Sequence, residues 1–314
     1  MVETVNIAAD AATVKWGFHD ASSEPVLSVE SGATVSIDTL TGEPWDMPTE
    51  ELGMAMLPEQ ADVHQNADRG QGPHMVTGPV YVEGAMPGDV LQVDILDITV
   101  RQSWGWSLIQ PLLGTLPEDF HEKRLFHHPI DIAANTVTLP WGKTLALKPF
   151  FGILAVAPPV NWGRITSIIP RDHGGNMDNK ELTAGTTVYF PVFNEGAMFS
   201  AGDGHGVQGD GEVCLTAVEA ALTGTFKLTV RKDLAFPLPR AESADWIMTM
   251  GFHEDLDDAV KIALRAMIDW IVDLRGLSRE EAYLLCSLAA DLRVTQTVDI
   301  NKGIHCMLPK DVLT

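Results

Sequence analysis

Glycines separate the acidic and imidazole side chains in the segment AGDGHGVQGDGE, residues 201–212. In extended backbone, side chains two residues apart point to the same side. Asp203 and His205 should therefore face together, as should Asp210 and Glu212. A carboxylate and an imidazole at this spacing are suitable ligands for a divalent cation. The alternative is a glycine-rich turn with solvated acids.

A second cluster lies in RDHGGNMDNKELTAG, residues 171–185. After a sharp turn at Gly174, its polar side chains can reach one point, although Asn and Asp can equally stabilise a turn through local hydrogen bonds. The intervening residues 181–200 predict two strands and a turn at residues 194–196. Because a hairpin returns its ends to one edge of a sheet, the two clusters should converge. The expected metal ligands are His173, Asn176, Asp178, Asp203 and His205.

Three further residues are candidates for catalysis. Glu83 follows the apolar run VYV, where burial would raise its pKa and suit it to general acid–base work; the alternative is a strand-end glutamate paired with lysine or backbone amides. Glu212 is the other candidate base, and His74 is a candidate that could equally be a plain loop residue. No GxSxG motif is present, so a metal-activated water is favoured over a covalent nucleophile.

Two weaker patterns have ordinary explanations. The glycines at 204, 206 and 209 match GxGxxG, but this acidic loop would repel a pyrophosphate and lies in no βαβ unit. The tryptophans of WGW, residues 104–106, and Trp162 can wall a small pocket or simply fill the core. Nucleotide binding is therefore not expected.

The elements that position these residues are mainly strands. Apolar residues alternate in ESGATVSID, AMPGDVLQVDILDI and LTAGTTVYFPV, each with a turn glycine. In the second, Pro87-Gly88 predicts a turn in which the glycine has positive φ. The pattern predicts a β-sandwich or jelly-roll-like core over residues 1–230, with a loose loop at 40–75 and a covering loop or short helix at 113–130.

Residues 231–314 have a different pattern, so the fold class is mainly β with an α+β C-terminal part packed on the core. Residues 255–275 place apolar side chains at helical spacing, and Gly276 ends that helix. Ser278 and Glu281 form a capping box for a second helix. Residues 292–298 return to strand.

Composition restricts the partners and the compartment. The chain of 314 residues has 43 acidic and 21 basic residues and a net charge of −22, so nucleic acid is an unsuitable partner. No apolar stretch is long enough to span a membrane. Three widely spaced cysteines and no visible export signal indicate a reducing compartment, and we expect a cytoplasmic protein.

Several blocks together resemble the acetamidase/formamidase family. They are TGPVYVEGAMPGDVLQVDILDI, WGWSLIQPLLGTLPEDF, FGILAVAPP, HGGNMDNKELTAGTTVYFPVFNEGAMFSAGDGHGVQGDGEV and DLRVTQTVDINKGIHCMLPK. VHQNADRGQGPH departs from the pattern, so we expect a different pocket rim. The resemblance implies hydrolysis of small carboxamides to a carboxylate and ammonia, a homodimer, and bound zinc, with calcium as the alternative. Some members of the family also open γ-lactams.

The resulting hypothesis is an amidase whose cation primes a water molecule for attack on the amide carbonyl. Two alternatives remain from the sequence. One is a lactam hydrolase on the same scaffold, and the other is a non-catalytic module stabilised by calcium.

Overall fold

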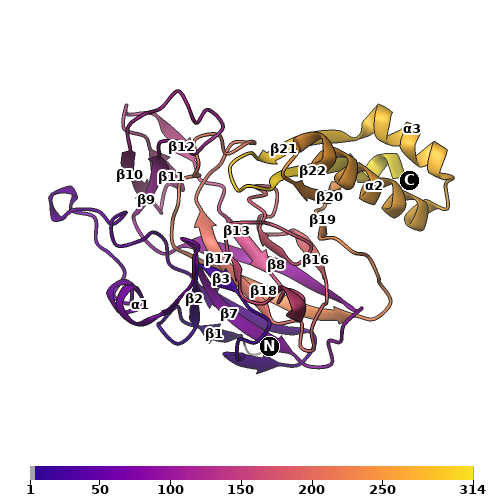
Figure 1. Cartoon of the computed structure of the whole chain (residues 1–314), viewed down its shortest axis with the longest axis horizontal. Helices are drawn as coiled ribbons and strands as arrows, with labels where there is room; N and C mark the ends of the chain where they lie inside the picture. The colour runs from indigo at the N-terminus through magenta and orange to yellow at the C-terminus, as the bar shows by residue number, and fades with distance from the viewer. Residues whose placement is uncertain (1–3, 314) are drawn as a thin grey trace.

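Alternating apolar residues build two large β-sheets that pack on one core in the computed structural model, which describes residues 4–313 (Figure 1). The larger sheet has nine strands: β1 (Val5–Ile7), β5 (Ala33–Asp38), β18 (Leu222–Arg231), β8 (Val90–Val100), β16 (Thr187–Pro191), β19 (Arg240–Glu242), β20 (Trp246–His253), β22 (Lys302–Pro309) and β21 (Asp291–Gln296), in spatial order. The second sheet runs β15 (Gly174–Asn176), β13 (Phe150–Ala155), β17 (Phe199–His205), β7 (Met75–Val82), β2 (Val14–Trp16) and β6 (Asp68–Arg69), with β4 (Leu27–Val29) beside β7.

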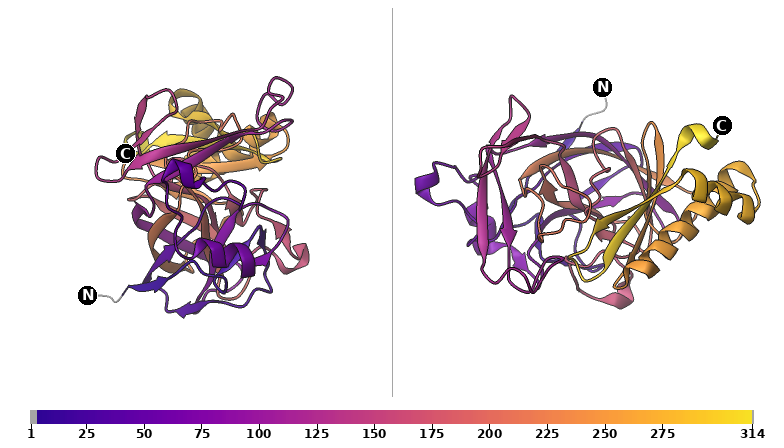
Figure 2. Two further views of the ribbon diagram at one scale, coloured as in Figure 1. Left: turned by 90° about the vertical axis from the view of Figure 1, so that its left-hand side faces the viewer. Right: turned by 90° about the horizontal axis from the view of Figure 1, so that it is seen from above.

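The remaining elements are small. A four-stranded sheet contains β12 (Thr144–Ala146), β11 (Thr136–Thr138), β10 (Arg124–Asp131) and β9 (Trp104–Ile109), and β3 (Phe18–His19) pairs with β14 (Ile165–Thr166). The helices are α1 (Gln60–Asn66), α2 (Leu256–Arg275) and α3 (Arg279–Ala289), and the 3-10 turns are η1 (Glu50–Leu52), η2 (Val160–Trp162) and η3 (Lys310–Leu313). The four-stranded sheet and the pair α2–α3 lie at opposite ends of the molecule (Figure 2).

The main core lies between the two large sheets. Phe226 of the nine-stranded sheet contacts Phe151 and Phe199 of the other sheet, with ring centroids 5.5 and 5.4 Å apart. All three side chains are fully buried. Burial of such aromatic surface is the main favourable term for a sandwich of this kind. The prediction of a mainly β, sandwich-like fold is confirmed.

The C-terminal helices form as their sequence predicts. In α2, Ala259, Ala263, Met267 and Ile271 recur at helical spacing and are buried against β20 and β22. Gly276 ends α2 with a left-handed φ of 66°. The helix α3 begins with the complete capping box between Ser278 and Glu281.

The C-terminal part shares a sheet with the rest of the chain. Strands β19 to β22 continue the nine-stranded sheet beyond β16, and Met248 and Met250 of β20 join the main core. The opposite face of β20 contributes Ile247 to a second core under α2 and α3. The division of the chain at residue 230 stays a prediction.

Two local predictions were wrong. Strands β16 and β17 are not a hairpin, because β16 pairs with β8 and β19 whereas β17 pairs with β13 and β7. The turn at residues 194–196 instead carries the chain from one sheet to the other. Within the covering loop expected at 113–130, β10 pairs with β9 through six residues.

Other local expectations agree with the structure. Gly88 has a φ of 95°, and the amide of Asp89 donates to the carbonyl of Met86 across the turn. Cys214, Cys286 and Cys306 are free thiols. Among the residues described, none of the helices has the length and apolar character needed to cross a membrane.

Candidate active site

Three neighbouring strands, rather than a hairpin, bring the two predicted clusters together. Ile153 of β13 lies opposite Asn176 of β15 on one side and opposite Gly202 of β17 on the other. Asp178 follows β15 by two residues, and Asp203 lies within β17. The two segments therefore converge as predicted, but they do so because β15 and β17 both pair with β13, and not through a hairpin.

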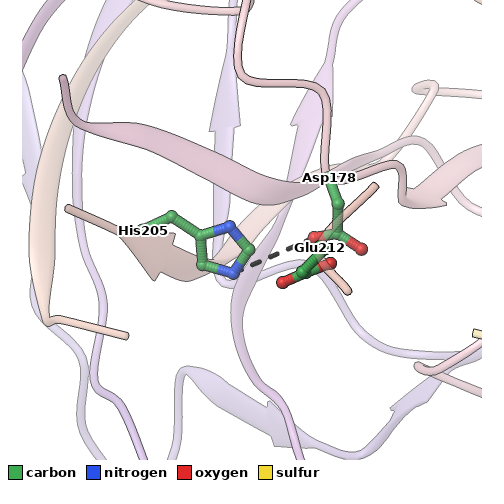
Figure 3. Close-up of side chains that lie close together, drawn as sticks. All are labelled: Asp178, His205 and Glu212. Atoms are coloured by element: carbon green, nitrogen blue, oxygen red, sulfur yellow. Dashed lines mark ion pairs between the residues drawn. The ribbon is translucent and has the colours of Figure 1, made fainter. Parts of the chain in front are cut away.

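The cluster is centred on His205, which is 1% exposed. Its Nε2 lies 3.2 Å from Glu219 Oε2, 3.3 Å from Asp203 Oδ2 and 3.9 Å from Asp178 Oδ1. Its ring lies perpendicular to the ring of Phe150, with centroids 4.9 Å apart. In Figure 3 the imidazole of His205 points toward the carboxyl groups of Asp178 and Glu212, which lie close to each other.

Two overlapping sets of side chains have ligand atoms within 4.8 Å of one another. One set is Asp178, His205 and Glu212, and the other is Asp203, His205 and Glu219. Both carboxylate oxygens of Asp178 and the side-chain oxygen of Asn176 are buried and have no hydrogen-bond partner. Buried acceptors left in this way are costly unless a cation or donor satisfies them.

Gly152 explains how three polar side chains fit above β13. A Cβ atom at this position would lie 2.5 Å from Asp178 Oδ1, 2.5 Å from Asp203 Oδ2 and 2.8 Å from His205 Cε1. Its carbonyl also accepts from the amides of Met177 and Asp178. A side chain of any size at residue 152 would therefore occupy the space of the cluster.

The backbone is strained at three of the acids. Asp178, Asp203 and Glu212 have φ values of 49°, 55° and 44°, a region that non-glycine residues rarely adopt. Such conformations persist where surrounding structure holds them, and they concentrate at functional sites. The strain aims these carboxylates inward, whereas Asp210 turns outward to pair with Lys180. The expectation that Asp210 and Glu212 face together was wrong.

Burial and mutual repulsion shift the acids toward their neutral forms. Burial, opposed in part by His205, raises the pKa of Glu219 to about 7, and burial with the neighbouring Asp178 raises the pKa of Glu212 well above its usual range. Burial and the repulsion of Asp178 and Glu212 likewise raise the pKa of Asp299. These carboxyl groups lie close together, and the surrounding side chains do not supply enough positive charge to keep all of them ionised.

Two members of the cluster, His205 and Asp203, are instead shifted toward their charged forms. Burial disfavours the charged imidazole of His205, but Glu219 and Asp203 outweigh it and raise the pKa of His205 well above 6.5. Burial would raise the pKa of Asp203, yet His74 and His205 hold it below its usual value. The cluster therefore holds positive charge best at the position of His205.

A cavity of about 380 Å³ opens onto this cluster. Its polar base includes Asn176, Asp178, Asp203, His205, Glu212, Glu219 and Asp299. Its walls are mainly apolar, with Met75, Trp106, Leu108, Leu113, Leu215 and Ile300 among them. Residues 41–43, 45, 46, 73 and 74, within the loop predicted at 40–75, also line the cavity.

The remaining predicted residues separate into two groups. His74 lies in the cavity wall, with Nε2 4.0 Å from Asp203 Oδ2 and Nδ1 2.9 Å from Ser167 Oγ. His173 is buried but lies against His19 and Trp162 and does not line the cavity. Glu83 is exposed at the end of β7 near Ser28, so the structure does not bring it to the cluster.

Trp106 lines the cavity as one of the expected aromatic walls, whereas Trp104 is core and Trp162 packs on His173. Sequence reasoning missed Glu219, Asp299 and Gly152. Glu219 is a single acid within the apolar run AVEAAL, and a lone carboxylate in such a run indicates burial. Asp299 lies in the β21–β22 connection and had no comparable signal.

These features define a β-sandwich protein with a buried acid–imidazole cluster at the base of a cavity. The model of the acetamidase/formamidase family matches residues 8–162 and 159–314. The chain belongs to this family.

Individual relatives agree with that assignment. An acetamidase of Mycolicibacterium smegmatis is 31% identical over 198 residues, covering 45% of this chain and 49% of the relative, and a formamidase of Methylophilus methylotrophus is 31% identical over 212 residues, covering 51% and 52%. The chain thus spans about half the length of these relatives in the match. The crystal structure of an acetamidase from Bacillus halodurans is 33% identical, covers 98% of both chains and has a TM-score of 0.84.

A more distant structure shares the fold. A gamma lactamase from Delftia acidovorans covers 97% of this chain and 90% of its own, with 23% identity and a TM-score of 0.62. At this identity the likeness concerns the fold alone.

Proposed function

We propose that this protein hydrolyses the C–N bond of small carboxamides, giving a carboxylate and ammonia. The observation that carries the proposal is the convergence of Asp178, Asp203, Glu212 and Glu219 on His205 at the base of a cavity. The names of the relatives, acetamidase and formamidase, agree with this chemistry.

The residues present fit a divalent cation. The acids are buried, raise one another's pKa and leave carboxylate oxygens without partners, so a cation would offset charge that the chain itself does not offset. We propose Asp178, Asp203, His205 and Glu219 as the ligands, with zinc favoured by the imidazole and calcium as the alternative. When bound, such a cation polarises a carbonyl and eases the deprotonation of water.

Glu212 is the proposed general base. Its carboxyl group lies beside Asp178 and His205 but makes no hydrogen bond to another described side chain, whereas Glu219 is held by His205 and the amide of Ala217. The raised pKa of Glu212 suits it to accept a proton from the attacking water and to deliver it to the leaving nitrogen. That delivery matters because an amide anion is a very poor leaving group.

His74 has a positioning role in this proposal. Its hydrogen bond to Ser167 fixes the ring, and its Nε2 faces Asp203 from the cavity wall. The imidazole thereby orients the Asp203 carboxylate. The substrate's small apolar group would lie against Trp106 and Leu108.

The test of this function uses two glutamates of the same chain. Glu212→Gln should lower kcat for acetamide or formamide by about 10²–10⁴-fold, because it removes the proton acceptor and keeps the size of the side chain. Glu83→Gln is the matched control and should change kcat by less than about twofold. Ammonia release from both amides measures the effect. Equal losses in the two variants, or none in Glu212→Gln, would refute the role of Glu212.

A lactam is a second candidate substrate because the cavity of about 380 Å³ is larger than acetamide requires. A panel of linear amides and γ-lactams, assayed for ammonia and amino acid release respectively, separates the two substrates. Turnover of lactams in preference to acetamide would replace the first candidate. Absence of turnover of either class would favour the calcium-stabilised module.

A further inference from the structure

A second cavity, of about 730 Å³, lies between the nine-stranded sheet and the C-terminal end of α2. Tyr189 of β16, Arg240 of β19 and Trp270 of α2 line it, together with residues of η3. It shares no lining residue with the cavity over His205. The proposed amide hydrolysis makes no use of it.

The lining of this cavity is richer in positive than in negative charge, in a chain whose net charge is −22. The cations are Arg231, Arg240, Arg275 and Lys310, and the carboxylates are Asp233, Glu242 and Asp273. Arg231 pairs with Asp233 and Lys310 pairs with Glu242, each at 2.6 Å. Arg240 and Arg275 are left with Asp273 alone, so one positive charge in the lining has no partner carboxylate.

The guanidinium of Arg240 lies against two aromatic rings. Its guanidinium carbon lies 3.7 Å from the ring centroid of Phe236 and 4.3 Å from that of Trp270. Aromatic contacts of this kind cover the flat faces of a guanidinium and leave its edge to bind. Among residues 4–313, Arg240 forms no ion pair, and its buried Nε has no hydrogen-bond partner.

We propose that this cavity binds a small organic monoanion, with a carboxylate on the edge of Arg240 and an apolar body in the cavity. Leu234, Ile247 and Leu274 in the lining offer apolar contact to such a body. The volume is within the range of small-molecule sites, and a planar guanidinium matches a carboxylate with two parallel hydrogen bonds. The charge left over in the lining matches a single negative charge on the ligand.

Hexanoate and its neutral counterpart 1-hexanol are suitable probes in isothermal titration calorimetry with the full-length protein. Hexanoate should bind at least tenfold more tightly than 1-hexanol. Arg240→Gln should weaken hexanoate binding at least tenfold. Arg265→Gln, which changes an exposed arginine on the same helix as Trp270, should leave it within twofold. Equal affinity for hexanoate and 1-hexanol, or unchanged binding by Arg240→Gln, would overturn the proposal.

Two further variants test whether hexanoate binds in this cavity and not in the cavity over His205. Asp203→Asn changes the catalytic cluster and should leave hexanoate binding within twofold, whereas a loss in this variant would assign the binding to the other cavity. Arg275→Gln changes an exposed side chain of the same lining and replaces Arg240→Gln if that variant does not fold. It should weaken binding at least threefold, and unchanged binding would contradict the proposal. Ammonia release by Arg240→Gln should equal that of the wild type.

Discussion

At the scale of single residues, the cluster depends on a position that carries no functional group. Gly152 is needed because the space above its Cα is filled by Asp178, Asp203 and His205. In the sequence, FGILAVAPP is only one of the blocks that resemble the family, and the glycine within it had no visible purpose. Its role follows from strands that lie far apart in the sequence, so only the fold reveals it.

Gly152→Ala should therefore weaken divalent cation binding at least tenfold and lower amide turnover correspondingly. The added Cβ would lie 2.5 Å from two carboxylate oxygens, so those side chains must move. Gly209→Ala is the matched control, because a Cβ there meets nothing within 4 Å and its φ is not in the left-handed region. Calorimetric titration with zinc measures the affinity, and equal affinities for the two variants would contradict the packing argument.

Glu219 gives a prediction on pH dependence in protein freed of metal. Its pKa is raised from 4.5 to about 7, so the folded state binds more protons than the unfolded state between these values. The contribution of Glu219 to stability is therefore present at low pH and is lost as pH rises through this window.

Glu219→Gln mimics the protonated acid. Relative to the wild type, its free energy of unfolding should be similar at pH 4.5 and higher by about 1–3 kcal/mol at pH 8. Urea denaturation of both metal-free proteins at the two pH values measures the difference. A difference independent of pH would mean that Glu219 does not titrate in this way.

At the scale of elements, the helix signals of the C-terminal part were read correctly, whereas the partners of several strands were not. The spacing in α2, the end at Gly276 and the capping box of α3 are properties of neighbouring residues, so the sequence contains them. The partner of a strand is not a local property. Strands β16 and β17 look like a hairpin because a short turn joins them, yet each pairs with strands of a different sheet.

The capping box predicts the effect of Ser278→Ala. The hydroxyl of Ser278 accepts a hydrogen bond from the amide of Glu281 and donates one to its carboxylate, and loss of both should lower the free energy of unfolding by about 1 kcal/mol. Ser287→Ala changes an exposed serine of the same helix and should cost nothing, because alanine favours helix. Urea denaturation compares the two. Amide turnover should be unchanged in both, and an equal loss of stability would show that the cap is unimportant.

At the scale of the whole molecule, the C-terminal part completes the site instead of only packing beside it. The amide of Gly211 donates to Thr295, and the amide of Thr297 donates to Gly211, so β21 holds the loop that carries Glu212. Asp299 enters the same cavity from the β21–β22 connection. The sequence predicted a metal site on the β-rich core alone, because nothing local links residues 211 and 295.

The homodimer stays a prediction at this scale. Light scattering on the purified chain should give about twice the monomer mass of 34.1 kDa. A mass equal to that of one chain would contradict it.

We propose that the acids around His205 bind one divalent cation and that amide hydrolysis depends on it. Ammonia release from acetamide or formamide, measured after removal of metal with a chelator and then during stepwise addition of zinc or calcium, tests this most directly. We predict that activity is lost on removal and returns in proportion to added cation up to about one equivalent per chain. Full activity in the metal-free protein would show that hydrolysis does not depend on a bound cation.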